Sequence, residues 1–534
     1  MRSLELANLS PERIRAEQSR WPNRTLAQCL AEQAARRPAG VAIQDGTRQL
    51  TLGQFLQTVR GEAAELRSRG VGEGDIVAYQ LPTAIETVVL HYAITWLGAI
   101  ACPISLLHRE RDLKHMLGLV QPRLAFARPS LRGVAYADML RSAVAGAATK
   151  TEVIELLPEQ PLSGPRAEPG EGPVSDPNQP LYVVWTSGTS GEPKGVAHTS
   201  NTGLCGLGAK LDRLAVTDDD AILVITPLAH HIGIYAMHML ALAGIRLVLM
   251  ESWRPDLAVE LIERLRATFT CGTPTFLVDL MRCETLGRHD VSSLRIFSCG
   301  GAPVPPPVVE TASEKLPACR VLSSYGTSEE GYVTSVGPED PAELSAVSDG
   351  RPLKDMEVRV LSPERQPISS GQEGDLVVRT PSAFAGYVLR PELTREELLP
   401  GGWRWTGDRA VLRPDGTVRI TGRSKDIIIR GGINVPVVQV EAALLRHRAV
   451  SAVAIVAMPD ERLGERACAF VVPAAGQNPA LEDLKAFLAE QGLAPVYWPE
   501  RLELIEQLPM TASGKIQKFQ LRQTIAGIVQ AEQA

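Results

Sequence analysis

The stretch WTSGTSGEPKGVAH (residues 185–198) gathers hydroxyl groups, glycines and one lysine directly after the hydrophobic run at residues 181–184. Glycines let backbone N–H groups close around an anion, the hydroxyls add donors, and Lys194 adds a positive charge. These donors suit a polyphosphate. A Walker A loop is excluded, because counting from Gly188 places Pro193 where the second glycine of that motif must stand. Taken alone, the stretch could equally be a polar turn between a strand and a helix.

A second stretch, SSYGTSEEGY (residues 323–332), combines an aromatic ring, hydroxyls and carboxylates. Tyr325 could stack on a nucleobase and the hydroxyls could bond a phosphate. Glu329 could hold Mg²⁺, which prefers carboxylate oxygens together with substrate phosphates. This second set of groups favours the polyphosphate interpretation of the first stretch.

Three further stretches carry charged groups next to glycines. In WRWTGDRA, Asp408 follows a glycine and could accept hydrogen bonds from ribose hydroxyls. Residues 420–435, ITGRSKDIIIRGGINV, place a basic cluster beside two glycines. In LPMTASGKIQKFQLR (residues 508–522), Lys515 lies in a Ser/Gly-rich turn before an amphipathic helix. Taken alone, each of these three stretches is explained more simply as a turn, a solvated charge run or the start of a helix than as a binding site.

The elements around these stretches alternate between helices and short apolar strands. Helical spacing is found at residues 26–37, 52–69 and 255–266. Strands are expected at residues 76–79, 124–126, 181–185, 221–225 and 246–250. Residues 159–180 are rich in Pro, Gly and Ser and are expected to be a surface connector. The alternation is typical of an α/β fold with mostly parallel sheets.

The pattern changes after about residue 350, where short strands dominate. Strands are expected at residues 358–361, 374–380, 410–413 and 417–421, and the last two flank a PDG turn typical of a hairpin. A compact α/β unit follows, with strands at 450–457, 467–472 and 501–505 and helices at 481–491 and from 519. We predict an N-terminal domain over residues 1–423, with a β-rich subdomain at about 350–423, and a C-terminal domain over residues 424–534.

Composition bounds the class of protein. The 534 residues are 44% hydrophobic and 22% charged, which suits a globular chain, and the net charge of −6 argues against a nucleic-acid partner. Eight cysteines form no CxxC pair, so we expect reduced thiols and a cytoplasmic protein. The first residues lack the apolar core of a secretory signal. Two apolar segments, 88–107 and 235–250, contain histidine or charged residues and are expected to be buried rather than membrane-inserted.

Together the five stretches resemble the adenylate-forming superfamily, which comprises acyl- and aryl-CoA synthetases, stand-alone adenylation domains and luciferases. The resemblance runs from about residue 26 to residue 522. TSGTSGEPKG matches its phosphate loop, YGTSE its adenine and Mg²⁺ motif, TGD its ribose motif, GRSKD its hinge and TASGK its catalytic-lysine loop. PLAHHIG (residues 227–233) and CGGAP (residues 299–303) match two segments that line the acyl pocket and the adenine site. The chain looks most like ligases of the cyclohexanecarboxylate–CoA type.

The resemblance implies a two-step reaction with ATP and Mg²⁺: a carboxylic acid becomes an acyl-adenylate with release of pyrophosphate, and the thiol of coenzyme A then displaces AMP. It implies Lys515, Glu329 and Lys194 as catalytic groups, with Glu329 on the metal. The implied nucleotide site comprises Thr186, Ser187, Gly188, Thr189, Ser190, Gly191, Lys194, Gly301, Ala302, Pro303, Tyr325, Gly326, Thr327, Ser328, Glu329, Asp408, Arg423 and Lys515.

The resemblance also implies a C-terminal domain that swings between the two steps. Its hinge would be Lys425, and rotation would replace Lys515 by a coenzyme A channel built from Arg430, Gly431 and Gly432. The implied acyl pocket contains His230, Ile234, Cys299 and Gly300. A positioned cation such as Lys515 is needed because the attacking carboxylate and the phosphate are both anions.

Some positions depart from the family pattern and keep alternatives open. His231 stands where ligases for 2-hydroxylated aryl acids usually carry Asn, so salicylate and dihydroxybenzoate are not expected. Ile433 and Gln439 replace common glutamates, and Met510 replaces a basic residue. An enzyme that loads the phosphopantetheine of an acyl carrier protein is the main alternative, and a non-catalytic nucleotide-binding relative is a remote one. A monomer or a homodimer is expected.

Overall fold

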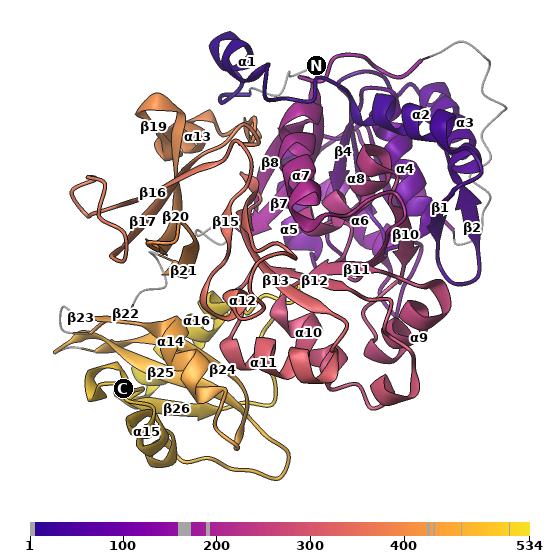
Figure 1. Cartoon of the computed structure of the whole chain (residues 1–534). Helices are drawn as coiled ribbons and strands as arrows, with labels where there is room; N and C mark the ends of the chain where they lie inside the picture. The colour runs from indigo at the N-terminus through magenta and orange to yellow at the C-terminus, as the bar shows by residue number, and fades with distance from the viewer. Residues whose placement is uncertain are drawn as a thin grey trace.

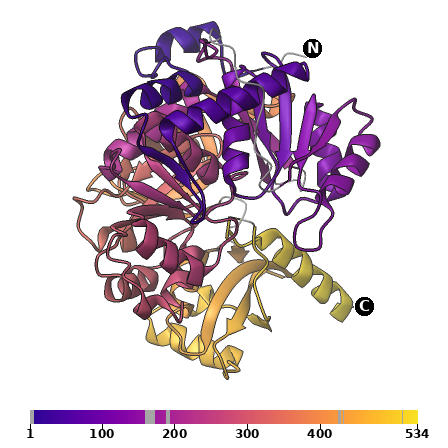
Figure 2. The same ribbon diagram turned by 90° about the vertical axis from the view of Figure 1, so that its right-hand side faces the viewer.

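The chain folds around two large β-sheets, to which two smaller sheets are attached (Figure 1). The computed structural model describes residues 6–157, 172–187, 193–423, 428–430, 433–460, 462–511 and 513–533. Figure 2 shows the C-terminal unit, in yellow, beneath the body formed by the rest of the chain.

The first large sheet has nine strands within the described ranges, and most neighbours are parallel. From edge to edge they are β15 (Arg351–Pro352), β14 (Gly331–Ser335), β13 (Arg320–Thr327), β12 (Ile296–Gly300), β11 (Phe269–Gly272), β9 (Ala221–Val224), β10 (Arg246–Leu249), β1 (Val41–Gln44) and β2 (Gln49–Thr51). Strands β13 to β1 run parallel, and antiparallel strands flank them at both edges. Gly300 at the end of β12 pairs with Ser324 on β13, which brings two of the predicted motifs together.

The second large sheet has seven strands in the part of the chain that the structure describes. In order they are β18 (Gly386–Tyr387), β8 (Pro193–Thr199), β7 (Pro180–Ser187), β4 (Ile100–Pro103), β3 (Ile76–Gln80), β5 (Leu124–Ala127) and β6 (Glu152–Glu155). Strands β7 to β6 are parallel, whereas β8 pairs antiparallel with both β7 and β18. The phosphate-loop stretch therefore spans a β7–β8 hairpin and not a strand-to-helix turn.

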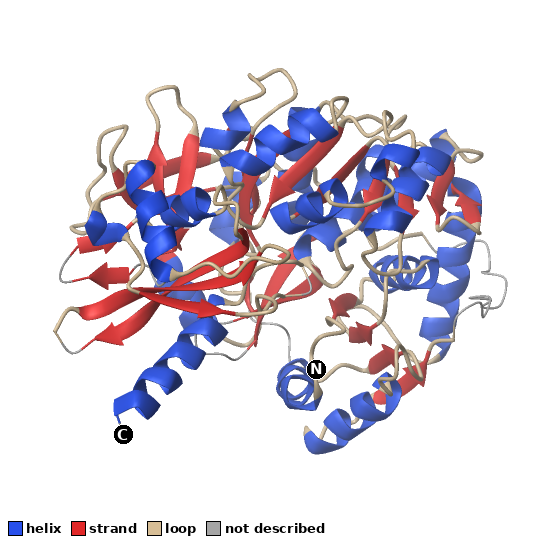
Figure 3. Ribbon diagram, turned by 90° about the horizontal axis from the view of Figure 1, so that it is seen from below, coloured by secondary structure: helices blue, strands red, loops and turns tan. Residues whose placement is uncertain are grey.

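Helices cover both sheets and fill the space between them (Figure 3). The body contains α1 (Pro11–Glu17), α2 (Leu26–Arg36), α3 (Leu52–Ser68), α4 (Ile85–Trp96), α5 (Glu110–Val120), α6 (Tyr136–Gly146), α7 (Ser200–Leu214), α8 (His231–Ala243), α9 (Pro255–Leu265), α10 (Pro274–Met281), α11 (Pro306–Lys315), α12 (Leu344–Val347) and α13 (Pro391–Glu397), with 3₁₀ turns at Leu286–Arg288 and Pro400–Gly402. Helices α4 and α8 share one core with strands of both sheets, and every residue of α4 is buried.

The burial of α4 and α8 explains the two long apolar segments of the sequence, which were expected to be buried. A helix enclosed between two sheets is apolar all round, so hydropathy alone resembles that of a membrane segment. No described helix is both long and apolar enough to cross a membrane. The cytoplasmic location stays a prediction.

The two smaller sheets follow in sequence. The first contains β16 (Glu357–Leu361), β17 (Glu373–Arg379), β20 (Trp403–Leu412), β19 (Leu398–Leu399) and β21 (Val418–Arg423). The second contains β23 (Ile433–Val435), β22 (Ile428–Arg430), β25 (Gly464–Pro473), β24 (Val450–Asp460) and β26 (Arg501–Leu504), with helices α14 (Val437–Leu444), α15 (Leu481–Glu490) and α16 (Lys518–Gln533) and a 3₁₀ turn at Pro495–Tyr497. The PDG turn joins β20 and β21 as an antiparallel hairpin, as expected.

The predicted α/β class with mostly parallel sheets is confirmed, and the predicted helices and strands are found within a few residues of their expected bounds, except that the strand expected at 410–413 is the end of the longer β20. The antiparallel edge strands were not predicted. Most of the expected connector at residues 159–180 lies outside the described residues. The division of the chain at residues 423 and 424 stays a prediction.

Candidate active site

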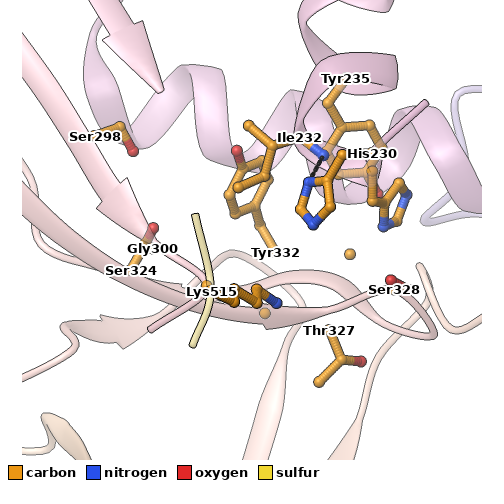
Figure 4. Close-up of a pocket in the computed structure, with 14 residues that line it drawn as sticks. His230, Ile232, Tyr235, Ser298, Gly300, Ser324, Thr327, Ser328, Tyr332 and Lys515 are labelled. Atoms are coloured by element: carbon orange, nitrogen blue, oxygen red, sulfur yellow. Dashed lines mark hydrogen bonds between the residues drawn. The ribbon is translucent and has the colours of Figure 1, made fainter. Parts of the chain in front are cut away.

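One pocket lies between strands β12, β13 and β14 of the first large sheet, the start of α8 and Lys515 of the C-terminal unit (Figure 4). It encloses about 500 Å³ of empty space when the open solvent at its mouth is included. Its wall consists of His230, His231, Ile232, Tyr235, Ser298, Gly300, Gly301, Ser324, Gly326, Thr327, Ser328, Gly331, Tyr332 and Lys515. Residues from four separate predicted motifs therefore share one cavity.

Lys515 reaches this pocket from a tight turn of the C-terminal unit. Its backbone N–H donates to Thr511 Oγ1 at 3.0 Å, and the Thr511 N–H donates to the Lys515 carbonyl at 2.7 Å. A Cβ at Gly301 would lie 2.9 Å from Lys515 Cε, so the absence of a side chain at this position gives the lysine its room. The Thr275 hydroxyl donates to the Gly514 carbonyl at 3.0 Å and fixes the turn against the body.

The environment of Lys515 lowers the pKa of its side chain. The pKa of its ammonium group falls to about 8, first because the group is buried and then because Arg423 is near, while Asp408 and Glu329 oppose the shift. At neutral pH the lysine is therefore charged. Such a cation is available to an anionic ligand.

His230 lies on the opposite wall, where it caps the start of α8. Its Nδ1 accepts a hydrogen bond from the Ile232 N–H at 3.3 Å (Figure 4). Burial, and then the charge of Lys515, lower the pKa of His230 to about 3, so the ring is neutral. Because Nδ1 is an acceptor, the single ring proton is on Nε2. His230 therefore offers a neutral donor.

A network of charged side chains extends from the pocket on the side of Glu329. The Tyr387 hydroxyl lies 2.9 Å from Glu329 Oε1 and 3.0 Å from Glu397 Oε1. Arg404 forms a buried ion pair with Glu330 and a second one with Glu397, at 2.9 Å. Because a phenol has one proton, Tyr387 donates to one of its two carboxylates at a time.

This network keeps Glu329 ionised. Burial acts to raise its pKa, but Arg404 and the Tyr387 hydroxyl outweigh that effect, and the pKa lies below the usual value. In contrast, burial raises the pKa of Glu397. A buried carboxylate held in its charged form fits a role as a Mg²⁺ ligand alongside substrate phosphates. Among the described residues, no group of three or more His, Cys, Asp or Glu could form an all-protein metal cage.

Lys194 joins the same network from strand β8. Its Nζ lies 4.8 Å from the ring centroid of Tyr387, and the two strands that carry these residues are neighbours, with Tyr387 opposite Val196. The phenol therefore contacts the phosphate-loop lysine with its ring and Glu329 with its hydroxyl. On the other strand of the hairpin, Thr186 pairs with Lys194.

The predicted ribose and adenine residues form a separate small cluster. The Tyr325 hydroxyl donates to Asp408 Oδ2 at 2.6 Å, and Arg423 Nε lies 3.2 Å from Asp408 Oδ1. Asp408 and Arg423 are cross-strand partners on β20 and β21. His198 Nε2 donates to the Ser328 carbonyl at 2.8 Å and so fixes the loop between this cluster and the pocket.

The structure brings some predicted site residues to the pocket and leaves others elsewhere. Ile234 and Cys299 are fully buried in the cores of the body, while their neighbours Ile232 and Ser298 line the cavity. Side chains alternate along β12, so Cys299 points away from the side that Ser298 faces. Arg430 forms an ion pair with Glu500 at 2.9 Å and does not line the pocket.

Other predicted residues cannot be placed at the pocket. Ala302 and Pro303 follow Gly301 but are not part of the cavity wall. The predictions that lie outside the described residues are Gly188, Thr189, Ser190, Gly191, Lys425, Gly431 and Gly432, and only the backbone of Ser187 is described. Their roles, like those of the other site residues, stay predictions.

Several residues of the site were not expected from the sequence. Tyr235, Tyr332 and Ser298 line the pocket, and Tyr387 and Arg404 hold Glu329. Arg404 stands in the quoted stretch WRWTGDRA between two tryptophans, and strand alternation would have placed it on the exposed face. Tyr387 lies near no quoted motif, and only the fold brings it to Glu329.

Two family models match the chain. The model described as AMP-binding enzyme matches residues 30–388, and that described as AMP-binding enzyme C-terminal domain matches residues 439–515. The chain is 32% identical over 521 residues to the medium-chain fatty-acid–CoA ligase of Escherichia coli (strain K12), and the matched region covers 95% of this chain and 92% of that protein. It is 29% identical over 515 residues to the 2,3-dihydroxybenzoate-AMP ligase of Bacillus subtilis (strain 168), and that match covers 95% of this chain and 94% of that protein. ATP-bound MatB from Rhodopseudomonas palustris has a similar structure, with a TM-score of 0.85 and 25% identity over 94% of this chain and 99% of that one.

Proposed function

Because the chain belongs to the AMP-binding enzyme family and is an acid–thiol ligase of the adenylate-forming superfamily, we propose that it converts a small or medium carboxylic acid into its coenzyme A thioester. The observation that carries the proposal is the position of Lys515. It lies at the edge shared by the pocket wall and the charged network around Glu329. A cation there could contact an acid in the pocket and a phosphate beside the network at the same time.

In the first step, a carboxylate oxygen of the acid attacks the α-phosphorus of ATP, and the bond to the pyrophosphate oxygen breaks. Negative charge gathers on the phosphate oxygens as the two anions approach. We expect Lys515, which lines the pocket, to stabilise that charge, and the proton on His230 Nε2 to orient the acid. Bound Mg²⁺, held by Glu329, would supply further charge stabilisation.

The nucleotide would lie along the charged side of the pocket. Lys194 would hold the β- and γ-phosphates, and Asp408 with Arg423 would bind the ribose hydroxyls. The side chain of Tyr325, which lies against Asp408, would pack on the adenine. Tyr387 acts as a positioning residue, because it contacts both Lys194 and Glu329.

In the second step, the thiolate of coenzyme A attacks the acyl carbon, and AMP leaves with the bonding electrons. We propose that the C-terminal unit turns about Lys425 between the steps and withdraws Lys515. Among the described residues, the side-chain contacts between the unit and the body include the Thr275–Gly514 hydrogen bond, the hydrogen bonds from Arg282 to Ser451 at 3.2 and 3.4 Å and the exposed Arg446–Glu310 ion pair at 3.0 Å. Contacts of this kind can break and reform at low cost.

A carrier protein is the second candidate acceptor. The departures at Ile433 and Gln439 lie on the C-terminal unit, and Ile433 exposes 45% of its surface. Loading of a phosphopantetheine arm would use the same chemistry with a protein-bound thiol. The similarity to a 2,3-dihydroxybenzoate-AMP ligase supports formation of the acyl-adenylate and does not require free coenzyme A as the acceptor.

The proposal is tested by pyrophosphate exchange over a panel of acids, followed by turnover with and without coenzyme A. We expect at least one acid to support exchange and coenzyme A to raise its turnover. If acids support exchange but coenzyme A never raises turnover, a carrier protein would be favoured over free coenzyme A as the thiol acceptor. Absence of exchange with every acid would contradict the ligase proposal.

A further inference from the structure

The N-terminal segment at residues 6–21 precedes the region that the AMP-binding enzyme model matches, which begins at residue 30. Its helix α1 lies at the edge of the body, and none of the residues of this helix is buried (Figure 1). Burial of apolar surface therefore does not explain the position of α1. Hydrogen bonds attach the segment to the body instead, and several of them converge on the short stretch at residues 381–385. One comes from the ring N–H of Trp21, which donates to the Pro381 carbonyl at 2.8 Å.

Arg13 on α1 makes the charged contacts with this stretch. Its Nη2 donates to the Ala383 carbonyl at 2.5 Å, and its Nη1 donates to the Phe384 carbonyl at 3.0 Å. Asn8 adds a hydrogen bond from its side-chain amide to the Phe384 carbonyl at 2.9 Å, and its own carbonyl accepts from Arg13. Because hydrogen bonds from an ionised donor are stronger than those between neutral groups, Arg13 is the principal link between the segment and the stretch.

The stretch that Arg13 contacts is bonded on its other side to Glu329. The Phe384 N–H donates to the Glu329 carbonyl at 2.6 Å. This N–H and the Ala383 carbonyl belong to one planar peptide group, so a single rigid unit joins Arg13 to the backbone of Glu329. Three residues beyond Phe384, the Tyr387 hydroxyl lies 2.9 Å from the Glu329 carboxylate. The stretch and the strand that follows it therefore contact both the backbone and the side chain of Glu329.

Neighbouring residues of the stretch bind Glu330 in the same way. The Ser382 hydroxyl donates to the Glu330 carbonyl at 2.7 Å, and the Thr380 hydroxyl donates to the Glu330 carboxylate at 2.5 Å. Gly386 allows the N-terminal segment to approach, because its φ of 145° favours glycine and a Cβ there would lie 3.2 Å from the Ala7 nitrogen. Hydrogen bonds in a connected chain polarise one another. Removal of the charged donor at one end therefore weakens the bonds that follow.

We propose that Arg13 is a positioning residue, which acts through the Ala383–Phe384 peptide group to hold Glu329 in the orientation that binds Mg²⁺. The inference rests on the proposed function, in which Glu329 contacts the metal beside the phosphates of ATP. A metal ligand must be held within about 0.5 Å of its productive position, so a small shift of the stretch weakens binding. Arg13 does not line the pocket, and its removal leaves the residues that meet the acid in place.

The test is a calorimetric titration of the full chain with ATP, once with Mg²⁺ and once with EDTA. Arg13→Met keeps the apolar stem and removes the guanidinium. We expect it to raise the Kd for ATP with Mg²⁺ by about three- to tenfold and to change the Kd without metal by less than about twofold. Arg15→Met is the matched control on the same helix, because the side chain of Arg15 is 68% exposed and pairs with Glu12 at 3.3 Å. It should change neither Kd.

A double variant shows whether Arg13 acts through Glu329. Glu329→Gln alone should raise the Kd for ATP with Mg²⁺, and addition of Arg13→Met should raise it no further, because two changes to one interaction are not additive. If Arg13→Met does not fold, Asn8→Ala, which removes the amide donor to the Phe384 carbonyl, decides by the same comparison, with an expected rise of about twofold.

The outcomes separate this inference from the proposed function. A Kd for ATP with Mg²⁺ that Arg13→Met leaves unchanged, even if the variant is less stable to urea, would overturn the inference and leave the ligase function intact. So would an equal rise with and without Mg²⁺, or full additivity with Glu329→Gln. If Glu329→Gln alone does not weaken binding of ATP with Mg²⁺, the metal role of Glu329 in the proposed function is wrong, and the inference falls with it.

Discussion

The two sides of the pocket treat their polar groups in opposite ways. On the side of Glu329, each carboxylate has a charged or hydroxyl partner, and Arg404 joins two of them. On the side of Tyr235 the groups are neutral, and the rings of Tyr235 and Tyr332 stack with centroids 5.4 Å apart. A site that always binds the same charged group can be organised in advance by paired charges. The other side is shaped by the rings of its wall.

The first way to test this contrast is to break the charged side. Arg404→Met leaves the carboxylate of Glu330, which is fully buried, without its cation, and we expect a loss of about 3–5 kcal/mol in the free energy of unfolding. Urea titration measures it. Arg379→Met is the matched control, because the Arg379–Glu357 pair is more than one-third exposed and should contribute less than about 1 kcal/mol. Equal losses in the two variants would show that the network is not preorganised.

The second prediction concerns the lysine between the two sides. Lys515→Ala should slow acyl-adenylate formation by about two to three decades, since it removes the cation that we propose stabilises the transition state. Thioester formation from supplied acyl-adenylate should be largely preserved. Lys518→Ala removes a nearby lysine that pairs with Glu441 at 2.7 Å and does not line the pocket, and it should leave both half-reactions unchanged. Equal loss of both half-reactions in Lys515→Ala would refute the assignment of this lysine to the first step.

The third prediction follows from the lowered pKa of Lys515. Its value of about 8 means that the ammonium loses its proton as the pH rises through 8, well before a lysine in water would. The kcat/KM of adenylate formation should therefore be level up to about pH 7.5 and fall by about tenfold per pH unit well above 8. Lys515→Arg, which stays charged over this range, should retain part of the activity without that fall. A level profile to pH 9.5 in the native enzyme would contradict the role of the lysine.

The difference between the sides also explains how far the sequence could be interpreted. Motifs for a charged, recurrent ligand are contiguous, so TSGTSGEPKG, YGTSE and TASGK predict a nucleotide side, which stays a prediction, and the alternation of elements predicted the α/β class. Cys299 and Ile234 were expected at the acyl pocket, but the strand and helix faces turn Ser298 and Ile232 to it instead. Which face of an element meets a cavity is set by its packing partners, and these lie far away in the sequence.

Tyr387 shows the same limit on the charged side. It lies 58 residues beyond Glu329, on a two-residue strand, and its role depends on the pairing of β18 with β8. Non-local pairing of this kind leaves no local pattern. Arg404 is similar, because its partners Glu330 and Glu397 come from two other segments of the chain.

Two buried phenols, one on each side, give the most direct test of the contrast. Tyr387→Phe removes the hydroxyl that contacts Glu329, and Tyr235→Phe removes a hydroxyl of the pocket wall. The measurement is the KM for ATP, together with the KM for the preferred acid, in both variants. We predict that Tyr387→Phe raises the KM for ATP by about three- to tenfold and keeps the KM for the acid. Tyr235→Phe should change the KM for the acid and keep the KM for ATP. If both variants change the same parameter, the division of the pocket into a nucleotide side and an acid side is wrong.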